Sequence, residues 1–308
     1  MNNQYTVDVV IPTYKPDEKF LKLIHRLKKQ DYPLQHIYVI NTMSGHFPKE
    51  VEQMPGVVVT QIPQEEFDHG ATRDKGMQMS DAEVVVFMTQ DAVPADHQVI
   101  RKLVEALMQS EKIGISYARQ LPAEDCDYIE RFTRKFNYPE SSVIKGKDDI
   151  ERMGIKAFFC SDVCAAYRKD IYEKTGGFCK RTIFNEDMIL AGHMVMEGYL
   201  VAYAAEARVI HSHNYSGIQQ FHRNFDLAVS QTDHPEVFKM VHSESEGIKL
   251  VKDTVLHLLK VKRAYLIPAL IYKSGCKFLG YKMGQNYKKM PLWMIKKCSM
   301  NKTYWGNT

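Results

Sequence analysis

The chain has 308 residues, of which 44% are hydrophobic and 25% are charged, and its formal net charge at pH 7 is +4. This length and composition suit one large globular domain with an appendage and exclude a disordered or fibrous chain. The N-terminus lacks a basic start followed by a long apolar stretch, so we expect a first strand instead of an export signal, and a cytoplasmic protein. The six cysteines form no Cys-x-x-Cys pair, which favours reduced thiols that mostly pack in the interior.

The positive charge is concentrated at the end of the chain. Residues 249–308 contain 13 Lys and Arg residues against a single acid, Asp253, whereas the residues before them carry a net negative charge. A basic tail on an acidic body indicates an anionic partner, either a membrane surface or a nucleic acid. We therefore predict two modules, a body over residues 1–240 and a basic helical extension over residues 241–308.

Strand and helix patterns alternate along the body. Residues 7–11 are predicted to form a buried strand that Pro12 ends, and apolar residues at helical spacing predict a helix over 17–30. The next predicted elements are strands at 36–40 and 57–62, a short helix at 73–79, a strand at 84–88, a helix at 99–108 and a strand at 114–117. This alternation predicts an α/β fold with a mostly parallel central sheet flanked by helices. The stretch 122–152 is predicted to be a loop-like, mobile flap.

Polar clusters follow several of these strands and loops. The most informative is Thr89-Gln90-Asp91, which comes directly after the apolar strand 84–88. A carboxylate at the carboxyl end of a buried strand lies in the crevice where open α/β sheets bind ligands. Comparable clusters stand at residues 12–14, 67–73 and 185–187. Together they predict a nucleotide-sugar site.

In order and spacing, these motifs resemble the inverting glycosyltransferases of family 2, which have the GT-A fold. The resemblance covers residues 5–230 and is strongest to bacterial rhamnosyltransferases that use dTDP-L-rhamnose. It rests on Phe67-Asp68-His69-Gly70-Ala71-Thr72-Arg73 and Thr89-Gln90-Asp91-Ala92. It implies transfer of a sugar, by direct displacement with inversion, onto a hydroxyl of a lipid-linked glycan in cell-surface polysaccharide synthesis, at the inner face of the membrane.

The resemblance also implies which residues bind the donor. Pro12 and Tyr14 would touch the base or ribose, and Tyr14 could stack on a pyrimidine, although Pro12 could equally mark a plain strand end. Asn41 stands where many relatives have an Asp that recognises uracil, and its amide, which both donates and accepts, leaves the base open. The other donor-binding candidates are Asp68, His69, Ala71, Arg73, Gln90 and Asp91.

Two residues of the second cluster have chemistry of their own. Gly70 permits backbone geometry closed to other residues, and Arg73 offers a planar fork suited to base carbonyls or phosphate oxygens. The alternative for Arg73 is a surface ion pair with Asp74 or Asp81. Relatives often have Asn where this chain has Asp74, which adds a negative charge beside the predicted anion site.

A divalent metal is expected, although the Asp-x-Asp of metal-dependent relatives is reduced here to Thr89-Gln90-Asp91. One carboxylate together with substrate phosphates can hold Mg²⁺ or Mn²⁺. The resemblance favours His213, in His211-Ser212-His213, as a second ligand, and an imidazole slightly favours Mn²⁺. Alternatively, both histidines are ordinary polar residues that alternate on a strand.

The acids Glu186 and Asp187 begin a predicted helix. Acids at this position are explained by the helix dipole alone, but in the resembling enzymes such a pair faces the acceptor. A carboxylate within hydrogen-bond reach of the attacking hydroxyl can remove its proton. We predict Asp187 as this general base with Glu186 in support, and the resemblance makes Asp162 a ligand of an acceptor sugar hydroxyl.

The tail is predicted to act at a surface. Its apolar stretch 264–272 is interrupted by Pro268 and is too short to span a membrane. The lysines and aromatic residues beyond it fit an interfacial amphipathic region, and a homo-oligomerisation arm with solvated lysines is the alternative. Nucleic acid is not expected as a partner, because no recognition module accompanies the charge.

Three other functions stay open. The donor could be a UDP-sugar. A nucleotidyltransferase should have a glycine-rich phosphate loop near the first strand, which residues 12–16 do not provide. A non-catalytic nucleotide-sugar-binding scaffold would account for the reduced metal motif.

Overall fold

The fold comes from a computed structural model of the chain, which describes residues 4–239 and 244–306. The chain forms two compact units. The first is made of Met1–Ala123, Tyr138–Arg181 and Glu186–His211, and the second of Glu124–Asn137, Thr182–Asn185 and Ser212–Thr308. The predicted module boundary at 240–241 lies outside the described residues and stays a prediction.

The described part of the first unit is built on a nine-stranded sheet with the order β3-β2-β1-β4-β8-β6-β9-β5, and β7 pairs with β9. The strands are β1 Val7–Tyr14, β2 Ile37–Thr42, β3 Val57–Ile62, β4 Val84–Met88, β5 Val93–Pro94, β6 Ile113–Leu121, β7 Val143–Lys145, β8 Cys164–Arg168 and β9 Leu200–Ile210. Pairing is parallel from β3 through β4 and between β6 and β9, whereas β8 runs antiparallel to β4 and β6. The predicted α/β sheet is confirmed, and beyond β4 it is mixed.

Strand β1 continues past Pro12, so the prediction that this proline ends the strand is wrong. Pro12 pairs with Ile40 of β2, and Tyr14 pairs with Thr42. On the other side, the pairing of β1 with β4 ends at Val10. A proline cannot donate a backbone hydrogen bond, and it is tolerated here because β1 has a neighbour on one side only at this point.

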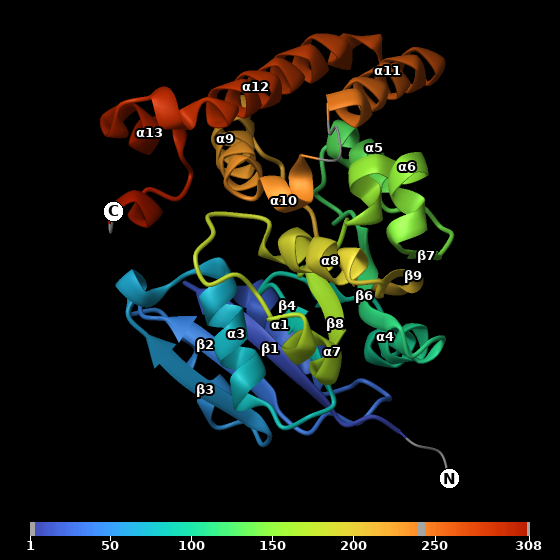
Figure 1. Cartoon of the computed structure of the whole chain (residues 1–308), viewed down its shortest axis with the longest axis vertical. Helices are drawn as coiled ribbons and strands as arrows, with labels where there is room; N and C mark the ends of the chain where they lie inside the picture. The colour runs from blue at the N-terminus through green and yellow to red at the C-terminus, as the bar shows by residue number, and fades with distance from the viewer. Residues whose placement is uncertain (1–3, 240–243, 307–308) are drawn as a thin grey trace. The chain divides into compact units, whose positions relative to one another are not determined.

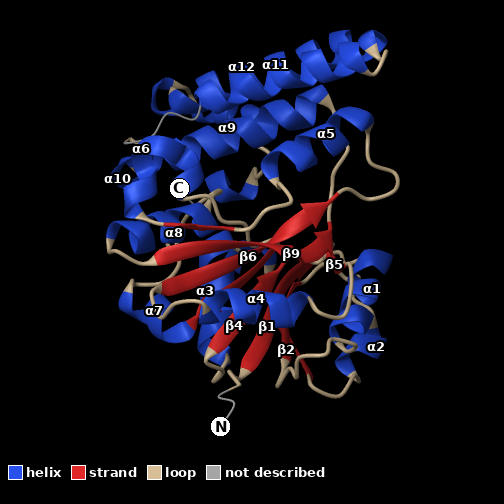
Figure 2. Ribbon diagram, turned by 90° about the vertical axis from the view of Figure 1, so that its right-hand side faces the viewer, coloured by secondary structure: helices blue, strands red, loops and turns tan. Residues whose placement is uncertain are grey.

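Helices cover both faces of the sheet, because successive strand residues point to opposite sides. One face packs in a single core with α1 (Glu18–Leu27) and α4 (Val99–Met108). The other face receives α3 (His69–Met79), whose Gly76 sits against Val10 of β1. Figure 2 shows α1 and α3 on opposite sides of the strands. Short or later helices complete the unit: α2 Lys49–Glu52, α6 Ile150–Met153, α7 Lys169–Lys174 and α8 Glu186–Met196.

The stretch 122–152, predicted to be a loop-like flap, contains regular structure instead. Its largest element is α5 (Tyr128–Asn137), which belongs to the second unit. Within α5, Arg134 Nε lies 2.7 Å from Glu130 Oε1, one helical turn earlier, and the two side chains form an ion pair. The Phe132 ring stacks on His257, which lies 125 residues later in the helix Glu244–Lys260. The stretch is therefore ordered partly by residues distant in sequence, which the local pattern could not indicate.

The second unit consists of helices α9 (Gly217–Asp233), α10 (Pro235–Phe238), α11 (Glu244–Lys260), α12 (Ile267–Gln285) and α13 (Leu292–Cys298), together with α5. Helix α12 lies along α9 (Figure 1). A side chain at Gly280 would come within 2.2 Å of the Phe221 carbonyl oxygen, so the two backbones are in direct contact. No helix within residues 4–239 and 244–306 is long and apolar enough to cross a membrane.

We expect Gly76→Ala to destabilise the chain, although Ala favours a helix. A Cβ at Gly76 would lie 2.3 Å from Val10 Cγ1 and 3.3 Å from Ile40 Cδ1, so the tightly packed helix must shift. Overpacking of this kind costs about 1–3 kcal/mol in the free energy of unfolding. Urea unfolding measures it, with the exposed neighbour Lys75→Ala as a control that changes stability by no more than about 0.5 kcal/mol. Equal stabilities of the two variants would contradict this close packing.

Candidate functional site

The predicted polar clusters of the first unit meet at one edge of its sheet. The parallel strands β1, β2 and β4 end there, at Tyr14, Thr42 and Met88. Strand β8 begins at the same edge, because Cys164 pairs in antiparallel fashion with Met88. Strands β6 and β9 end beside each other at Leu121 and Ile210. This is the edge at which open α/β sheets bind their ligands.

Gln90 joins the end of β4 to the end of β1. Its Oε1 accepts a hydrogen bond from the Tyr14 backbone N–H at 2.8 Å, and its Nε2 donates to the Tyr14 carbonyl oxygen at 3.1 Å. This side-chain amide therefore fixes the spacing between the loop with Asp91 and the loop with Tyr14. The Tyr14 side chain is left exposed, as stacking on a base requires. Donor contacts of Pro12, Tyr14 and Gln90 stay predictions.

Asn41 is buried in a row of side chains across β1, β2 and β3. The Thr13 hydroxyl donates to its Oδ1 at 3.0 Å, and its Nδ2 donates to Gln61 Oε1 at 2.6 Å. The predicted role of Asn41 in donor recognition stays a prediction, and here its amide binds within the sheet. Gln61 was missed by the sequence analysis, and only its register opposite Asn41 identifies it.

Helix α3 begins at His69, four residues earlier than predicted. Asp68 caps it, because its Oδ1 accepts hydrogen bonds from the backbone N–H groups of Gly70 and Ala71, both at 2.9 Å. The expectation that Gly70 supplies unusual backbone geometry is wrong, since Gly70 is helical. A Cβ at this position would lie 1.9 Å from the Cys179 carbonyl oxygen, so the glycine is needed for close approach.

Arg73 is buried between two carboxylates. Its Nε lies 3.0 Å from Asp162 Oδ2, and its Nη1 lies 2.8 Å from Glu186 Oε1. Nη1 also donates to the His69 carbonyl oxygen at 3.1 Å. The alternative of a surface pair with Asp74 or Asp81 is wrong, because Arg73 is buried and its guanidinium pairs with Asp162 and Glu186 instead. The guanidinium thus ties α3 to the segment before β8 and to the first turn of α8.

Asp187 is the most accessible of the three acids around Arg73. Asp162 and Glu186 are buried, whereas Asp187 is partly exposed. Its Oδ2 accepts from the Asp162 backbone N–H at 3.1 Å, and its Oδ1 accepts from the Met188 N–H at 2.7 Å. Burial and the charge of Glu186 raise the pKa of Asp187 to about 7, although Arg73 and the two N–H groups oppose the rise. The result is an oriented carboxyl group that titrates near neutrality.

Each carboxylate oxygen of Asp162 faces a different side chain. The Tyr167 hydroxyl donates to its Oδ1 at 2.7 Å, and its Oδ2 faces Arg73. Burial raises the pKa of Asp162 well above its ordinary value, against the attraction of Arg73. These contacts make Asp162 a support for Arg73 and, through its backbone N–H, for Asp187. A contact with an acceptor hydroxyl stays a prediction.

A second polar network surrounds His211 at the end of β9. His211 Nε2 lies 3.5 Å from Asp91 Oδ2, and its Nδ1 lies 3.0 Å from Gln120 Oε1. Gln120 is held in this orientation because its Nε2 donates to the Tyr138 hydroxyl at 2.6 Å and to Ser161 Oγ at 3.0 Å. An amide oxygen only accepts, so Nδ1 donates to Gln120 and Nε2 is the ring nitrogen turned toward Asp91.

Asp91 and His211 together offer a divalent ion one carboxylate oxygen and one imidazole nitrogen. The Gln120 oxygen on the other ring nitrogen is the kind of outer contact that orients a metal-binding histidine. This donor set fits Mn²⁺ better than Mg²⁺. His213, the ligand preferred from the sequence, belongs to the second unit. Its role as a ligand stays a prediction. Because His213 is two positions after His211 in the chain, the Cα atoms of the two residues lie within about 7 Å of each other.

The sequence analysis missed Gln120 and preferred His213 to His211. Gln120 lies on β6 and its partner His211 follows β9, 91 residues later, and these strands become neighbours only in the folded sheet. Tyr138 and Ser161 join the network in the same way. No local motif marks these residues. The available signal for Gln120 was its place near the end of a predicted strand.

Comparisons with known proteins agree with this architecture. Residues 8–176 match the family described as glycosyl transferase family 2. The chain is 35% identical to the O-antigen chain rhamnosyltransferase RfbN of Salmonella typhimurium, over 98% of this chain and 96% of that protein. It is 34% identical to the O-antigen chain rhamnosyltransferase WbaN of Salmonella anatum, over 97% and 95% of the two chains.

Among solved structures, the chain is similar to the mannosyltransferase PcManGT from Pyrobaculum calidifontis in complex with GDP-Man and Mn²⁺. The TM-score is 0.61 at 16% sequence identity, over 93% of this chain and 87% of that one. A likeness at this identity concerns the fold. It confirms the GT-A architecture expected from the sequence.

We expect Arg73→Met to lower the free energy of unfolding by about 3–5 kcal/mol near neutral pH, because it removes the buried guanidinium that pairs with Asp162 and Glu186. The loss should shrink as the pH falls from 7 toward 4.5, since the carboxyl of Asp187, with a pKa of about 7, then takes up a proton and the negative charge around the missing cation falls. Urea unfolding at the two pH values measures both effects. The control Arg101→Met removes a half-exposed pair with Asp31 and should cost about 0–1 kcal/mol. A loss for Arg73→Met that does not change with pH would contradict the ion-pair assignment.

Proposed function

We propose, on the premise that this chain belongs to glycosyl transferase family 2, that it transfers L-rhamnose from dTDP-L-rhamnose with inversion onto a hydroxyl of a lipid-linked glycan. The family makes it a glycosyltransferase. Two curated relatives that are O-antigen chain rhamnosyltransferases, similar over nearly the whole chain, support the rhamnosyl donor and a place in cell-surface polysaccharide synthesis. The observation that carries the proposed chemistry is the partly exposed Asp187 carboxyl, which two backbone N–H groups orient. Burial and the charge of Glu186 raise its pKa to about 7.

In the proposed reaction, Asp187 accepts the proton of an acceptor hydroxyl. The hydroxyl oxygen attacks the anomeric carbon as the bond from that carbon to the nucleoside diphosphate breaks, so the configuration is inverted and no covalent enzyme intermediate forms. A base with a pKa near the working pH can both take and release this proton. The backbone N–H groups of Asp162 and Met188 keep the carboxylate in one orientation.

Arg73, Glu186 and Asp162 have a positioning role in this proposal. The guanidinium of Arg73 holds Glu186 and Asp162 beside the base, and Asp162 in turn donates its N–H to Asp187. The negative charge of Glu186 contributes to the raised pKa of Asp187. The donor contacts predicted for Arg73, His69 and Asp68 rest on the family resemblance.

Asp91 and His211 would hold the divalent metal, with His213 as a further candidate. When bound, such an ion offsets the negative charge that develops on the leaving diphosphate. Gln120 keeps the proton of His211 on Nδ1 and so keeps Nε2 available for coordination. A carboxylate with a neutral imidazole supports Mn²⁺ as the metal.

The proposed place of action is the inner face of the cell membrane, with the second unit against the lipid. Large apolar side chains are exposed on α11, α12 and α13, among them Leu256, Leu279 and Trp293. Lysines are interleaved with them along the same helices. Apolar and basic side chains in this mixture suit an interfacial surface on anionic lipid. An oligomerisation surface is the alternative use of the same face.

A donor panel tests the function itself. Nucleoside diphosphate release is measured from dTDP-L-rhamnose, UDP-sugars and GDP-mannose, with Mn²⁺ or Mg²⁺ and a membrane lipid extract as acceptor. Acceptor-dependent turnover of dTDP-L-rhamnose is the expected result. Turnover of a UDP-sugar alone would support the proposed transfer reaction but contradict dTDP-L-rhamnose as the donor. No turnover of any donor would favour the non-catalytic scaffold.

The variant Asp187→Asn should lower kcat by about 10²–10⁴ while the donor Kd stays the same, because the amide keeps the shape of the site but cannot take the proton. Wild-type kcat should rise with pH through a midpoint near 7, as the carboxyl loses its proton. The matched control Asp170→Asn alters an exposed acid of the same unit that pairs with Lys174. Wild-type turnover in Asp187→Asn would show that another group is the base.

The variant Asp91→Ala should weaken Mn²⁺ binding and, with it, metal-dependent donor binding. Titration calorimetry of Mn²⁺ measures the first effect without any reaction. The variant Gln120→Ala should weaken Mn²⁺ binding by about 10–100-fold, because it removes the contact that orients His211. Unchanged Mn²⁺ affinity in both variants would place the metal elsewhere.

A further inference from the structure

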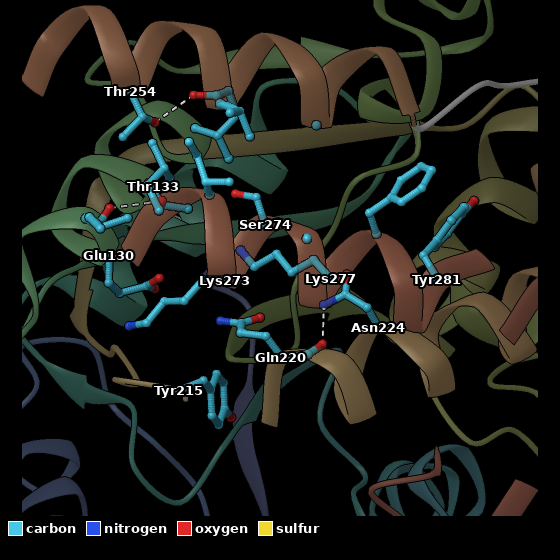
Figure 3. Close-up of a pocket in the computed structure, with 18 of the residues that line it drawn as sticks. Glu130, Thr133, Tyr215, Gln220, Asn224, Thr254, Lys273, Ser274, Lys277 and Tyr281 are labelled. Carbon is cyan, nitrogen blue, oxygen red and sulfur yellow. Dashed lines mark hydrogen bonds between the residues drawn. The ribbon is translucent and has the colours of Figure 1, made fainter. Parts of the chain in front are cut away.

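A cavity of about 730 Å³ lies inside the second unit, lined by helices α5, α9, α11 and α12 (Figure 3). All of the residues that line it belong to that unit. Most of its wall is apolar and includes Ile129, Leu227, Ile248, Val251, Leu270 and Phe278. This size and lining are typical of sites for small or elongated apolar ligands. Of the residues that line it, the proposed reaction involves only His213, as a further candidate for the metal.

The cavity opens at the surface through apolar side chains. Ile248, Ile271 and Phe278 are 60%, 59% and 56% exposed. Deeper in the wall, Leu270 and Thr254 are buried. An apolar ligand could therefore contact apolar side chains both at the rim and in the interior of the cavity. Exposed apolar groups around an opening are a feature of lipid and ligand sites.

One lysine reaches into this cavity without forming an ion pair within residues 4–239 and 244–306. Figure 3 shows the side chain of Lys277 extending from α12 between Ser274 and Gln220. Two of the neighbouring charged groups are already in ion pairs, Glu130 with Arg134 at 2.7 Å and Lys273 with Asp127 at 3.2 Å. Within residues 4–239 and 244–306, no hydrogen bond or ion pair engages the Lys277 ammonium group.

Burial lowers the pKa of Lys277, and Arg223 and Lys273 add to the effect, whereas Glu130 opposes it. A partly buried ammonium beside an apolar wall is stabilised by a bound anion. The cavity therefore combines room for a hydrocarbon chain with one site for negative charge. An inorganic anion would occupy only the site for negative charge, and a neutral hydrocarbon would occupy only the apolar part of the cavity.

We propose that this cavity binds the hydrocarbon chain of a phosphate-headed lipid, with Lys277 at the phosphate. The lysines and exposed apolar residues that surround the opening on α12 match the interface of an anionic membrane. Such a lipid is either a membrane phospholipid or a prenyl phosphate carrier, and the two share the chemistry that the cavity recognises. The proposal goes beyond the proposed function and needs no catalytic step.

Titration calorimetry on the whole chain with dodecyl phosphate, below its micelle concentration, tests the site. We expect saturable binding of one molecule and none of inorganic phosphate. Lys277→Ala should weaken the binding by roughly tenfold or more, as expected for a charge-assisted contact. The matched control Lys289→Ala removes an exposed lysine outside the cavity and should change the Kd by less than about twofold. Equal binding by both variants would overturn the proposal.

A cavity-filling variant tests the site for the hydrocarbon chain separately from the contact between Lys277 and the phosphate. Ser274→Trp places a large side chain in the wall of the cavity, and Leu279→Trp places the same side chain on the exposed part of α12. Circular dichroism melts confirm that both variants fold. Ser274→Trp should abolish binding of dodecyl phosphate and Leu279→Trp should preserve it. Binding retained by a folded Ser274→Trp would mean that the lipid lies outside the cavity.

Vesicle sedimentation distinguishes the two lipid sources. Lys277-dependent capture by phosphatidylglycerol vesicles would identify a phospholipid. Capture only by phosphatidylcholine vesicles that contain a prenyl phosphate would identify a carrier lipid, and capture by neither would overturn the proposal. The Asp187→Asn chain should bind dodecyl phosphate like the wild type, so failure of the lipid site and failure of the proposed function can be told apart.

Discussion

The candidate site depends on the buried guanidinium of Arg73. It lies between Asp162 and Glu186, and through them it connects α3 with the segment before β8 and with the start of α8. One cation among three acids leaves the pKa of Asp187 raised to about 7, since burial and the charge of Glu186 outweigh the attraction of Arg73. The same interaction therefore holds the site together and leaves one carboxyl group able to exchange a proton near neutral pH.

Side-chain amides link the remaining parts of the site. Gln90 connects the ends of β1 and β4, and Gln120 connects the ends of β6 and β9. Each amide is bound through its oxygen and its nitrogen, so it has one orientation. Gln120 in turn orients the His211 ring through its Nδ1, so that Nε2 faces Asp91. A chain with a single acid in its metal motif thus has a second candidate ligand already oriented by its neighbours.

Much of the first unit could be predicted from the sequence. The strands at 57–62 and 84–88 and the helix at 99–108 begin and end where the apolar patterns indicated. The extension of β1 past Pro12 and the fold of 122–152 depend on neighbours from other parts of the chain. The early start of α3 did have a local signal, the capping residue Asp68. The partners of Arg73 had none, because Asp162 and Glu186 come close to it only in the folded chain.

The central claim is that Asp187 titrates near neutrality because desolvation and the charge of Glu186 raise its pKa by more than Arg73 lowers it. The most direct measurement is the NMR titration of its carboxyl carbon in a chain labelled with ¹³C-aspartate, with the resonance assigned by its loss in Asp187→Asn. The account predicts a midpoint near 7. A midpoint near the ordinary value of about 4 would contradict it, because such a carboxylate is a weak base for the acceptor hydroxyl.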